Sequence, residues 1–376
     1  MQSEQADRAN HIEYRIKISA GMSRTIRKEA QGCESCTKER KKKMGRVSEL
    51  QIREAIANFK FTGRLIERKI FGSGHINDTY LLTFEIGDMG DMKVILQRMN
   101  REIFTKPVEL MENIVGVTSY LREKIIENGG NPERETLNII PAKDGKAYFV
   151  DFKGEYWRSY KFITDATCYD RVEKPEDFYE SAVAFGNFQR LLADYPAETL
   201  YETIEGFHDT RARLETFKQA VEKDICGRAD SVRKEIQFVL DHEELADVFG
   251  ELQEKGEIPL RVTHNDTKLN NIMIDNVTRK GICVIDLDTV MPGLAMNDFG
   301  DSIRFGASTA AEDERDLSKV SCSMELYEIY VKGFLEGCAG SLTPKEVELL
   351  PMGAKVMTYE SVSYTHLRAH ETSAHL

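Results

Sequence analysis

The sequence predicts an α+β protein with a small β-rich N-terminal lobe and a larger, mainly helical C-terminal lobe. Its 376 residues, 41% of them hydrophobic, can fill about two domains at roughly 100–200 residues each. Short runs with strand character follow one another up to residue 163, and patterns of helical period dominate after it. This order is typical of α+β folds and predicts a cleft between the lobes. We expect the hinge near residues 162–165.

The individual elements follow from the spacing of apolar residues. The apolar residues Leu50, Ile52, Ile56 and Phe59 suit a short amphipathic helix after Ser48. A longer helix is expected over 107–128. Strands are expected over 64–71, 79–85, 93–99, 137–141, 147–152 and 155–163. The N-terminal lobe then occupies 48–164 and the C-terminal lobe 165–360.

Both ends of the chain differ in composition from these lobes. Residues 1–47 contain twelve Lys and Arg against six Asp and Glu, without a sustained apolar period. We interpret them as a disordered basic extension. An over-extended start is a second interpretation, because Met44 directly precedes the first patterned segment. Residues 361–376 hold three of the eight histidines, and we expect an atypical, non-native tail there.

The composition argues against several classes of protein. A net charge of −12 is unfavourable for binding the phosphates of nucleic acid. No stretch reaches the roughly 18 apolar residues of a membrane span. Seven scattered cysteines do not resemble the disulfide framework of a small secreted domain. We therefore expect a cytoplasmic protein with reduced thiols that binds a small molecule, with no nucleic acid, membrane or obligate protein partner.

The segment 261–304 concentrates the polar residues that can carry chemistry. It contains His264 and Asp266 in a loop, Asn271 ahead of the apolar run 272–274, and a basic turn over 279–281. A second apolar run, 282–285, ends on Asp286 and Asp288. The pattern predicts a β-hairpin with carboxylates and a carboxamide at its strand ends.

Carboxylates and a carboxamide in this order are what phosphoryl transfer requires. Oxygen ligands hold Mg²⁺ against the phosphates, and one carboxylate orients and deprotonates the acceptor hydroxyl. Asp266 and Asn271 lie five residues apart, and Asp286 follows the next apolar strand, as in the catalytic loop and metal-binding aspartate of kinases. Any one of these residues alone could simply cap a turn. The three together predict a kinase.

The same segment carries a resemblance to a known family. THNDTKLNNIMID, VIDLDTVMPG and DFGDSIR resemble the motifs of the aminoglycoside phosphotransferase and choline kinase superfamily, most of all the N-acetylhexosamine 1-kinases. The similarity extends over about 48–360 and includes FGSGHINDTY, ILQRMN and FGNFQRLLADYP. It implies a bilobal protein-kinase-like fold with a nucleotide-binding N-lobe and a catalytic, substrate-binding C-lobe.

The resemblance also implies cofactors and residue roles. It makes Asp266 the catalytic base, and Asn271 and Asp286 the ligands of Mg²⁺. His264 becomes a structural member of the loop, and Asp288 a supporting or second-metal residue. The cofactors are then ATP and Mg²⁺, and the expected reaction is phosphorylation of a sugar, at the anomeric hydroxyl of an N-acetylhexosamine.

A glycine-containing loop between two predicted strands is the candidate cover for the ATP phosphates. Gly72, Ser73, Gly74 and Asn77 belong to it, although glycines also mark ordinary hairpin turns. Kinases carry a phosphate-pairing lysine on the strand that follows. Here Gln97 occupies that position and Arg98 is next to it, so both are candidate nucleotide contacts. Strand alternation faces the two side chains in opposite directions, and this puts Arg98 in doubt.

Two further charged groups complete the candidate site. Asp301 and Arg304 are three residues apart on a predicted helix, where they could bind the acceptor or form an ion pair with each other. We expect Arg158, beside the single tryptophan Trp157, to lie at the surface or in lobe packing rather than to contact a ligand.

Two alternative functions remain open at this level. An amino-alcohol kinase for choline or homoserine would keep the fold and change the acceptor. Choline calls for an aromatic cage, and the helical lobe has no tryptophan. A nucleotide-binding scaffold with weak or no turnover would fit the missing strand lysine, but not the intact set of Asp266, Asn271 and Asp286.

Overall fold

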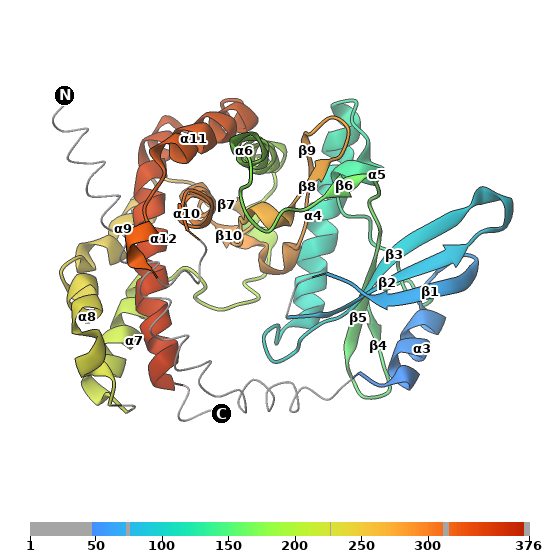
Figure 1. Cartoon of the computed structure of the whole chain (residues 1–376), viewed down its shortest axis with the longest axis horizontal. Coiled ribbons are helices and arrows are strands. Elements are labelled where there is room, and N and C mark those ends of the chain that lie inside the picture. Colours follow the sequence, from blue (N-terminus) through green and yellow to red (C-terminus); the bar gives the residue numbers. More distant parts are fainter. Residues whose placement is uncertain (1–46, 73–75, 226, 311–315, 372–376) are drawn as a thin grey trace.

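The protein has two lobes of different secondary structure (Figure 1). A computed structural model describes residues 47–72, 76–225, 227–310 and 316–371. Strands dominate up to β5 and helices dominate after it, as the sequence predicts. The α+β fold class is therefore confirmed. Ser73 and Gly74 lie outside the described residues, as do 1–46 and 372–376.

The N-terminal lobe is a five-stranded antiparallel sheet with helices against it. Its strands lie in the order β1-β2-β3-β5-β4. The strands are β1 (Arg64–Ile70), β2 (Asp78–Glu85), β3 (Asp91–Arg98), β4 (Phe149–Val150) and β5 (Tyr156–Lys161), and the helices are α3 (Glu49–Asn58), α4 (Pro107–Glu127) and α5 (Pro132–Glu135), with the short 3-10 turn η1 (Gly87–Met89). Ser48 caps α3 through a reciprocal capping box with Gln51, which explains why the helix begins there.

Alternation along β3 places α3 and α4 against opposite sides of the sheet. Val94 and Leu96 are fully buried with Ile52 and Ala55 of α3. Ile95 faces the other way and packs with the apolar residues of α4. Because side chains alternate across a strand, one strand contributes to both cores.

The predicted strand over 137–141 is not formed as a regular element. Ile139 makes only an isolated bridge to Tyr160, and β4 is two residues long. The stretch still contacts β5, because the Ile140 N–H donates to the Ser159 oxygen at 2.8 Å and the Lys161 N–H donates to the Asn138 oxygen at 2.9 Å. Pro141 has no N–H with which to extend a ladder. The predicted strand is therefore reduced to a short contact with β5 around Ile139.

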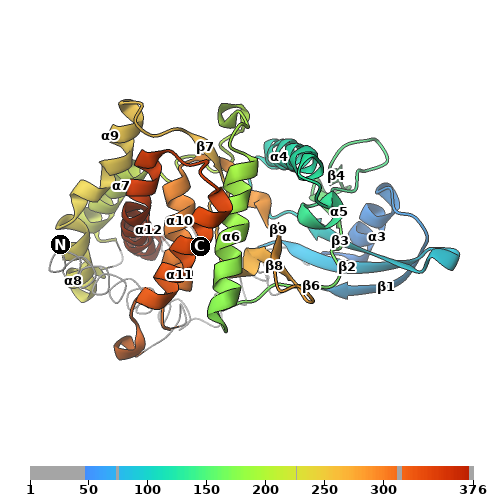
Figure 2. The same ribbon diagram turned by 90° about the horizontal axis from the view of Figure 1, so that it is seen from above.

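The C-terminal lobe is built from helices around two small sheets (Figure 2). One sheet pairs β7 (Arg261–Thr263) with β10 (Met291–Gly293), and the other has the order β6-β8-β9. The predicted hairpin is confirmed as β8 (Ile272–Asp275) and β9 (Gly281–Val284). The remaining elements are β6 (Ala166–Thr167), α6 (Pro175–Leu191), α7 (Thr210–Lys223), α8 (Arg233–Leu240), α9 (Val248–Glu254), α10 (Ala295–Gly306), α11 (Met324–Cys338) and α12 (Pro344–Glu371), with 3-10 turns η2 (Ala197–Thr199), η3 (Ala229–Val232), η4 (Glu243–Ala246), η5 (Leu269–Asn271), η6 (Leu287–Thr289) and η7 (Leu317–Lys319).

Helix α12 continues through the expected boundary at residue 360. Val362 and Ser363 are buried, and Glu360 accepts hydrogen bonds from Thr210 and His208. Helix α12 is therefore bonded to the start of α7 within the C-terminal lobe. Within the described residues, no helix is both long and apolar enough to span a membrane, and the cysteines in that part of the chain, Cys168, Cys283, Cys322 and Cys338, are free thiols.

Close contact between α6 and α11 depends on paired glycines. A Cβ at Gly337 would lie 2.3 Å from the backbone oxygen of Val183, and one at Gly186 would lie 2.3 Å from that of Phe334. Both obstacles are backbone atoms, so they cannot rotate away. The two helices can approach this closely only without those side chains.

We predict that Gly337→Ala lowers the free energy of unfolding by about 1–3 kcal/mol, because the helices must separate to admit the methyl group. Gly250→Ala is the matched control: a Cβ there meets only the flexible end of Arg211, at 3.3 Å. That change should be neutral or raise stability by up to about 1 kcal/mol through helix propensity. Urea denaturation measures both, and equal stability of Gly337→Ala and the wild type would contradict the packing.

Candidate active site

The loop between β7 and β8 holds Asp266 in a fixed setting. The Asn271 carboxamide donates to the backbone oxygen of Asp266 at 2.8 Å and to its Oδ2 at 3.2 Å. The Lys268 Nζ lies 2.8 Å from Asp266 Oδ1. The Asp266 side chain nevertheless keeps 31% of its surface accessible. The carboxylate is thus oriented by the chain and still open to a second molecule.

His264 shapes this loop from inside the protein. Its ring is fully buried, and Nε2 donates to the backbone oxygen of Ile285 at 2.8 Å. Nδ1 accepts from the backbone N–H of Asp266 at 3.2 Å. Both ring nitrogens are occupied by the backbone, which matches the structural part expected for this histidine. The ring joins the loop to the end of β9.

Asp298 on α10 anchors the start of the loop. Its Oδ2 accepts from the backbone N–H of His264 at 2.9 Å and its Oδ1 from that of Asn265 at 2.8 Å. Gln189 donates to Oδ2 as well, at 2.9 Å. Burial raises the pKa of Asp298, while His264 and the two backbone donors act against that rise. Asn265 has a φ of 63°, so the carboxylate stabilises a turn that the backbone alone disfavours.

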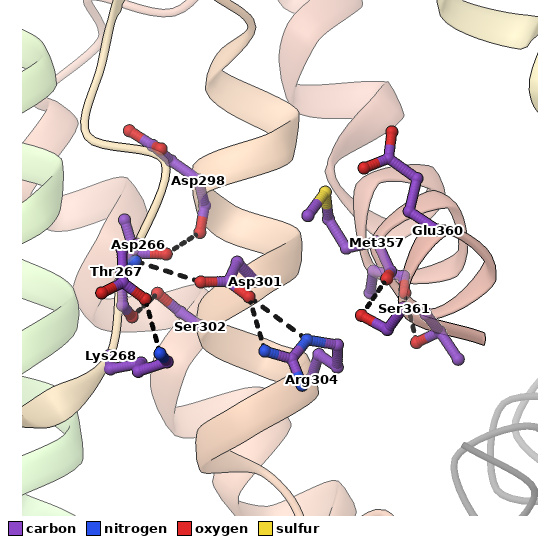
Figure 3. A network of polar contacts seen from close by, with 12 residues as sticks. Asp266, Thr267, Lys268, Asp298, Asp301, Ser302, Arg304, Met357, Glu360 and Ser361 are labelled. Carbon is purple, nitrogen blue, oxygen red and sulfur yellow. Dashed lines mark hydrogen bonds and ion pairs between the residues drawn. The ribbon is translucent and has the colours of Figure 1, made fainter. Parts of the chain in front are cut away.

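Asp301, also on α10, supports the next residue of the loop (Figure 3). Its Oδ2 accepts from the backbone N–H of Thr267 at 3.1 Å, and its Oδ1 accepts from Arg304 Nη2 at 2.9 Å. The Thr267 hydroxyl donates to the backbone oxygen of Asp298 at 2.5 Å. Burial would raise the pKa of Asp301, but Arg304 and Lys268 outweigh it and hold that pKa below its ordinary value.

Asp286 stands in a strained and negatively charged position. It connects β9 to η6 with a φ of 60° and a ψ of 57°, a left-handed conformation that is uncommon outside glycine. No hydrogen bond or ion pair engages its exposed carboxylate among the residues that the structure describes. The protein around this carboxylate removes part of its hydration, although the side chain still reaches solvent, and this raises the pKa of Asp286. The negative charges of Asp288 and, more weakly, Asp266 raise the pKa further, to about 6, against the effect of Arg158. An anionic oxygen ligand without a partner is therefore available there.

A chain of polar contacts joins this turn to the N-terminal lobe. Arg158 on β5 forms an ion pair with Asp288 and donates through Nε to Gln97 Oε1 at 3.0 Å. Asn77 donates to the other Asp288 oxygen at 2.8 Å. Burial acts to lower the pKa of Arg158, but Asp288 outweighs it and keeps that pKa above its ordinary value. Asn77 in turn accepts from the backbone N–H of Asn100.

The sequence pattern of the phosphotransferase enzyme family, known as APH, matches residues 67–318. This match covers more than half of the chain. The chain belongs to this family. Its members transfer phosphoryl groups, and the coarser prediction of a small-molecule kinase is confirmed with the family.

Solved structures show the same fold as this phosphotransferase at low identity. A microcompartment-associated aminopropanol kinase is 15% identical, covers 87% of this chain and 94% of its own, and has a TM-score of 0.52. Spectinomycin phosphotransferase, in complex with ADP and spectinomycin, is 14% identical, and the match covers 84% of this chain and 86% of that protein with a TM-score of 0.51. An amicoumacin kinase, in complex with AMP-PNP, Ca²⁺ and Ami, is 11% identical, and the match covers 88% of this chain and 89% of that protein with a TM-score of 0.54. These likenesses establish the bilobal kinase-like fold.

The structure separates the two candidate nucleotide contacts on β3. Gln97 faces the site, where it bonds Arg158 and Thr79. Arg98 points to the opposite side of the strand and forms an ion pair with Asp78, with Glu155 3.6 Å away. Arg98 is therefore withdrawn as a nucleotide contact, because strand alternation turns it from the site.

The other predicted residues are distributed as follows. Gly72 lies just after β1 with a φ of 83° and is exposed. Asn77 bonds Asp288 instead of standing open to a ligand. Asp301 and Arg304 form the ion pair that the sequence left as one of two possibilities, and the pair lies against the catalytic loop.

Sequence reasoning missed three residues of this phosphotransferase site. Arg158 was expected at the surface or in lobe packing, but it is 2% exposed and paired with Asp288 at the site. The absence of a lysine at position 97 could have prompted a search of the neighbouring strand. Asp298 shares a helix face with Asp301, three residues on, and that spacing could have found it. Lys268 was overlooked two residues after Asp266.

We predict that Asp286→Asn raises the melting temperature of the metal-free protein at pH 7.5. A folded-state pKa raised to about 6 means that ionised Asp286 destabilises the fold above that pH. The gain should shrink as the pH falls through 6 and disappear near pH 4, where both states are protonated. Differential scanning fluorimetry in EDTA over pH 4–8 measures it.

Asp275→Asn is the control of opposite sign. The backbone N–H groups of Thr278 and Val277 lower the pKa of Asp275, so its ionised form stabilises the fold above the ordinary pKa. That variant should lose stability at pH 7.5. If Asp286→Asn raised the melting temperature equally at every pH, the gain would come from the preference of asparagine for the left-handed turn. That result would contradict the claim that the ionised Asp286 carboxylate destabilises the fold.

Proposed function

We propose that this protein transfers the γ-phosphate of ATP to a hydroxyl of a small acceptor, with Asp266 as the base. One observation carries the proposal: an accessible carboxylate, oriented by Asn271 and Lys268, lies in a loop that is bonded to the residue before Asp286, because the Ile285 N–H donates to the Asn271 backbone oxygen at 2.9 Å. Phosphoryl transfer needs positioning and charge stabilisation more than covalent participation. The loop of Asp266 and the turn of Asp286 contain groups that can position a substrate and groups that can stabilise charge.

The donor set fits a hard divalent cation. Asp286 offers a carboxylate that has no partner among the described residues. Asn271 donates through its amide nitrogen, so its Oδ1 would be the ligand atom. The described residues contain no cluster of three or more His, Cys, Asp or Glu. Mg²⁺ retains waters and binds substrate phosphates alongside one or two carboxylates, so a closed cage is not required. When bound, Mg²⁺ would supply positive charge against the phosphates.

The proton chemistry belongs to Asp266. Its Oδ1 is engaged by Lys268, whereas its Oδ2 has the longer contact, 3.2 Å, to Asn271. We assign the acceptor hydroxyl to Oδ2, which orients the hydroxyl and takes its proton. The new O–P bond forms as the bond between the γ-phosphorus and its bridging oxygen breaks, and ADP leaves with that oxygen. Lys268 offsets the negative charge of the loop.

A sugar is the acceptor that the charges favour. The chain resembles N-acetylhexosamine 1-kinases in its motifs, and the site offers Asp301 and Arg304 beside Thr267. An amino alcohol carries an ammonium group, which needs a carboxylate not already neutralised. Arg304 neutralises Asp301, so this pair suits neutral hydroxyl and amide groups better. We therefore propose phosphorylation of an N-acetylhexosamine at its anomeric hydroxyl.

An amino-alcohol kinase is the second candidate, and an inactive scaffold the third. The amino-alcohol kinase is supported by the similarity to an aminopropanol kinase across 87% of this chain, although that likeness concerns the fold. The scaffold would explain the absent strand lysine. Against it, Asp266 is fully oriented and Asp286 is held in a strained turn, a cost that a site without function has no reason to keep.

We predict that Asp266→Asn lowers kcat by roughly 10²–10⁴-fold, because the amide cannot take the proton. Affinity for Mg·ATP should change little, since the proposed metal ligands remain. ADP-release kinetics and calorimetric titration with Mg·ATP measure the two quantities. A variant that retains most of the wild-type turnover would remove Asp266 from the role of base.

The acceptor is tested with a panel of N-acetylglucosamine, N-acetylgalactosamine, choline, ethanolamine, 1-amino-2-propanol and homoserine in the ADP-release assay. We predict turnover with an N-acetylhexosamine, and loss of the sugar's reducing end in the product, because the anomeric hydroxyl carries the phosphate. Turnover with an amino alcohol alone would select the second candidate. Binding of Mg·ATP without turnover of any acceptor would favour the scaffold.

A further inference from the structure

The position of the missing strand lysine is linked directly to an arginine on the next strand. Gln97 and Arg158 are register partners across the antiparallel pair of β3 and β5. Cross-strand partners project from the same face of a sheet, with their Cβ atoms about 5 Å apart. A cation on β5 therefore stands on the same face as position 97, one strand further along.

Arg158 is held from several directions. Its Nε donates to Gln97 at 3.0 Å, its Nη1 pairs with Asp288, and its guanidinium lies 5.4 Å from the centre of the Tyr160 ring. Gln97 is itself fixed by donating to Thr79 at 3.0 Å. The Arg158 side chain is 2% exposed. A buried guanidinium cannot be left unpaired without a large cost, so its contact with Asp288 constrains both partners.

The partner of Arg158 is two residues from the candidate metal ligand. Asp288 receives Arg158 on one oxygen and Asn77 on the other, at 2.8 Å, and both donors come from the N-terminal lobe. The short turn η6 connects Asp288 to Asp286. The N-terminal lobe therefore holds the turn that presents the Asp286 carboxylate.

We propose that Arg158, fixed by Gln97, is the N-lobe cation of this nucleotide site and positions the metal-binding turn through Asp288. It takes the structural place of the lysine that position 97 lacks. Arg158 is a positioning residue: it acts on the metal ligand through Asp288. The inference rests on the proposed binding of Mg·ATP at Asp286, and it adds the residue that couples the sheet to that site.

The test is calorimetric titration of ADP in Mg²⁺ and in EDTA, on the full chain. Arg158→Gln should weaken Mg²⁺-dependent ADP binding by roughly 10–100-fold, the range seen when residues behind a metal ligand are removed. Binding in EDTA should change less. Arg98→Gln is the matched control, because it removes a buried arginine from the same sheet on its other face. That variant should lose melting temperature but keep the wild-type Mg²⁺ dependence.

A charge swap separates positioning from general stability. Gln97→Lys combined with Arg158→Gln returns the cation to β3, at the register partner of Arg158 on the same face of the sheet. We expect the swap to restore most of the Mg²⁺-dependent affinity. Arg158→Lys keeps the charge but replaces the planar fork, whose Nε and Nη1 bond Gln97 and Asp288 separately, with a single ammonium, so intermediate affinity is expected. These two variants carry the test if Arg158→Gln does not fold.

The outcomes distinguish this inference from the proposed function. A wild-type protein that does not bind Mg·ADP overturns the proposed function. If the wild type binds and a folded Arg158→Gln binds equally well with the same Mg²⁺ dependence, only the inference about Arg158 is overturned. A folded swap variant that shows no recovery, or Arg158→Lys with wild-type affinity, would likewise reject the positioning role.

Discussion

The buried carboxylate of Asp298 is the interaction on which the site depends. It accepts the backbone N–H groups of two successive residues, His264 and Asn265, from a position on α10. Charge-assisted hydrogen bonds of this kind are stronger than neutral ones, and burial leaves water no means of replacing them. The bond to Gln189 adds α6 to the same anchor. The loop that carries Asp266 therefore has its conformation set by the helical core.

Around that anchor the protein gathers more negative charge than it neutralises. Asp266 is balanced in part by Lys268 and Asp288 by Arg158, whereas Asp286 has no cationic partner among the described residues. The raised pKa of Asp286, about 6, expresses this imbalance. A site that binds a divalent cation is expected to be destabilised in this way without it. Local instability and the proposed function thus have the same origin.

The two lobes are joined through side chains rather than by packing alone. Asp288 receives donors from Arg158 in the sheet and from Asn77 at the end of the glycine-containing loop. Both bonds lie beside the turn of the candidate metal ligand. Any change in the relative position of the lobes must alter these bonds, so the geometry of the metal ligand is coupled to the placement of the N-terminal lobe.

Much of the site could be predicted from the sequence because its parts are local in the chain. Asp266 and Asn271 are five residues apart on one loop, and the hairpin that leads to Asp286 follows at once, so spacing alone defines them. The order of strands and helices is likewise a local property, since apolar periodicity reports on each segment separately. The α+β class and the kinase motif were accordingly determined by the sequence.

What only the tertiary structure decided involves residues that are distant in the chain. Arg158 and Asp288 are 130 positions apart, and no local pattern indicates that they meet. Alternation distinguishes Gln97 from Arg98, but only the pairing of β3 with β5 shows which of them faces the site. The stretch over 137–141 has strand composition, yet it makes only a short contact with β5 around Ile139, and Pro141 has no N–H with which to extend it. Periodicity predicts how a segment folds, whereas the choice of partner depends on the packing of the whole chain.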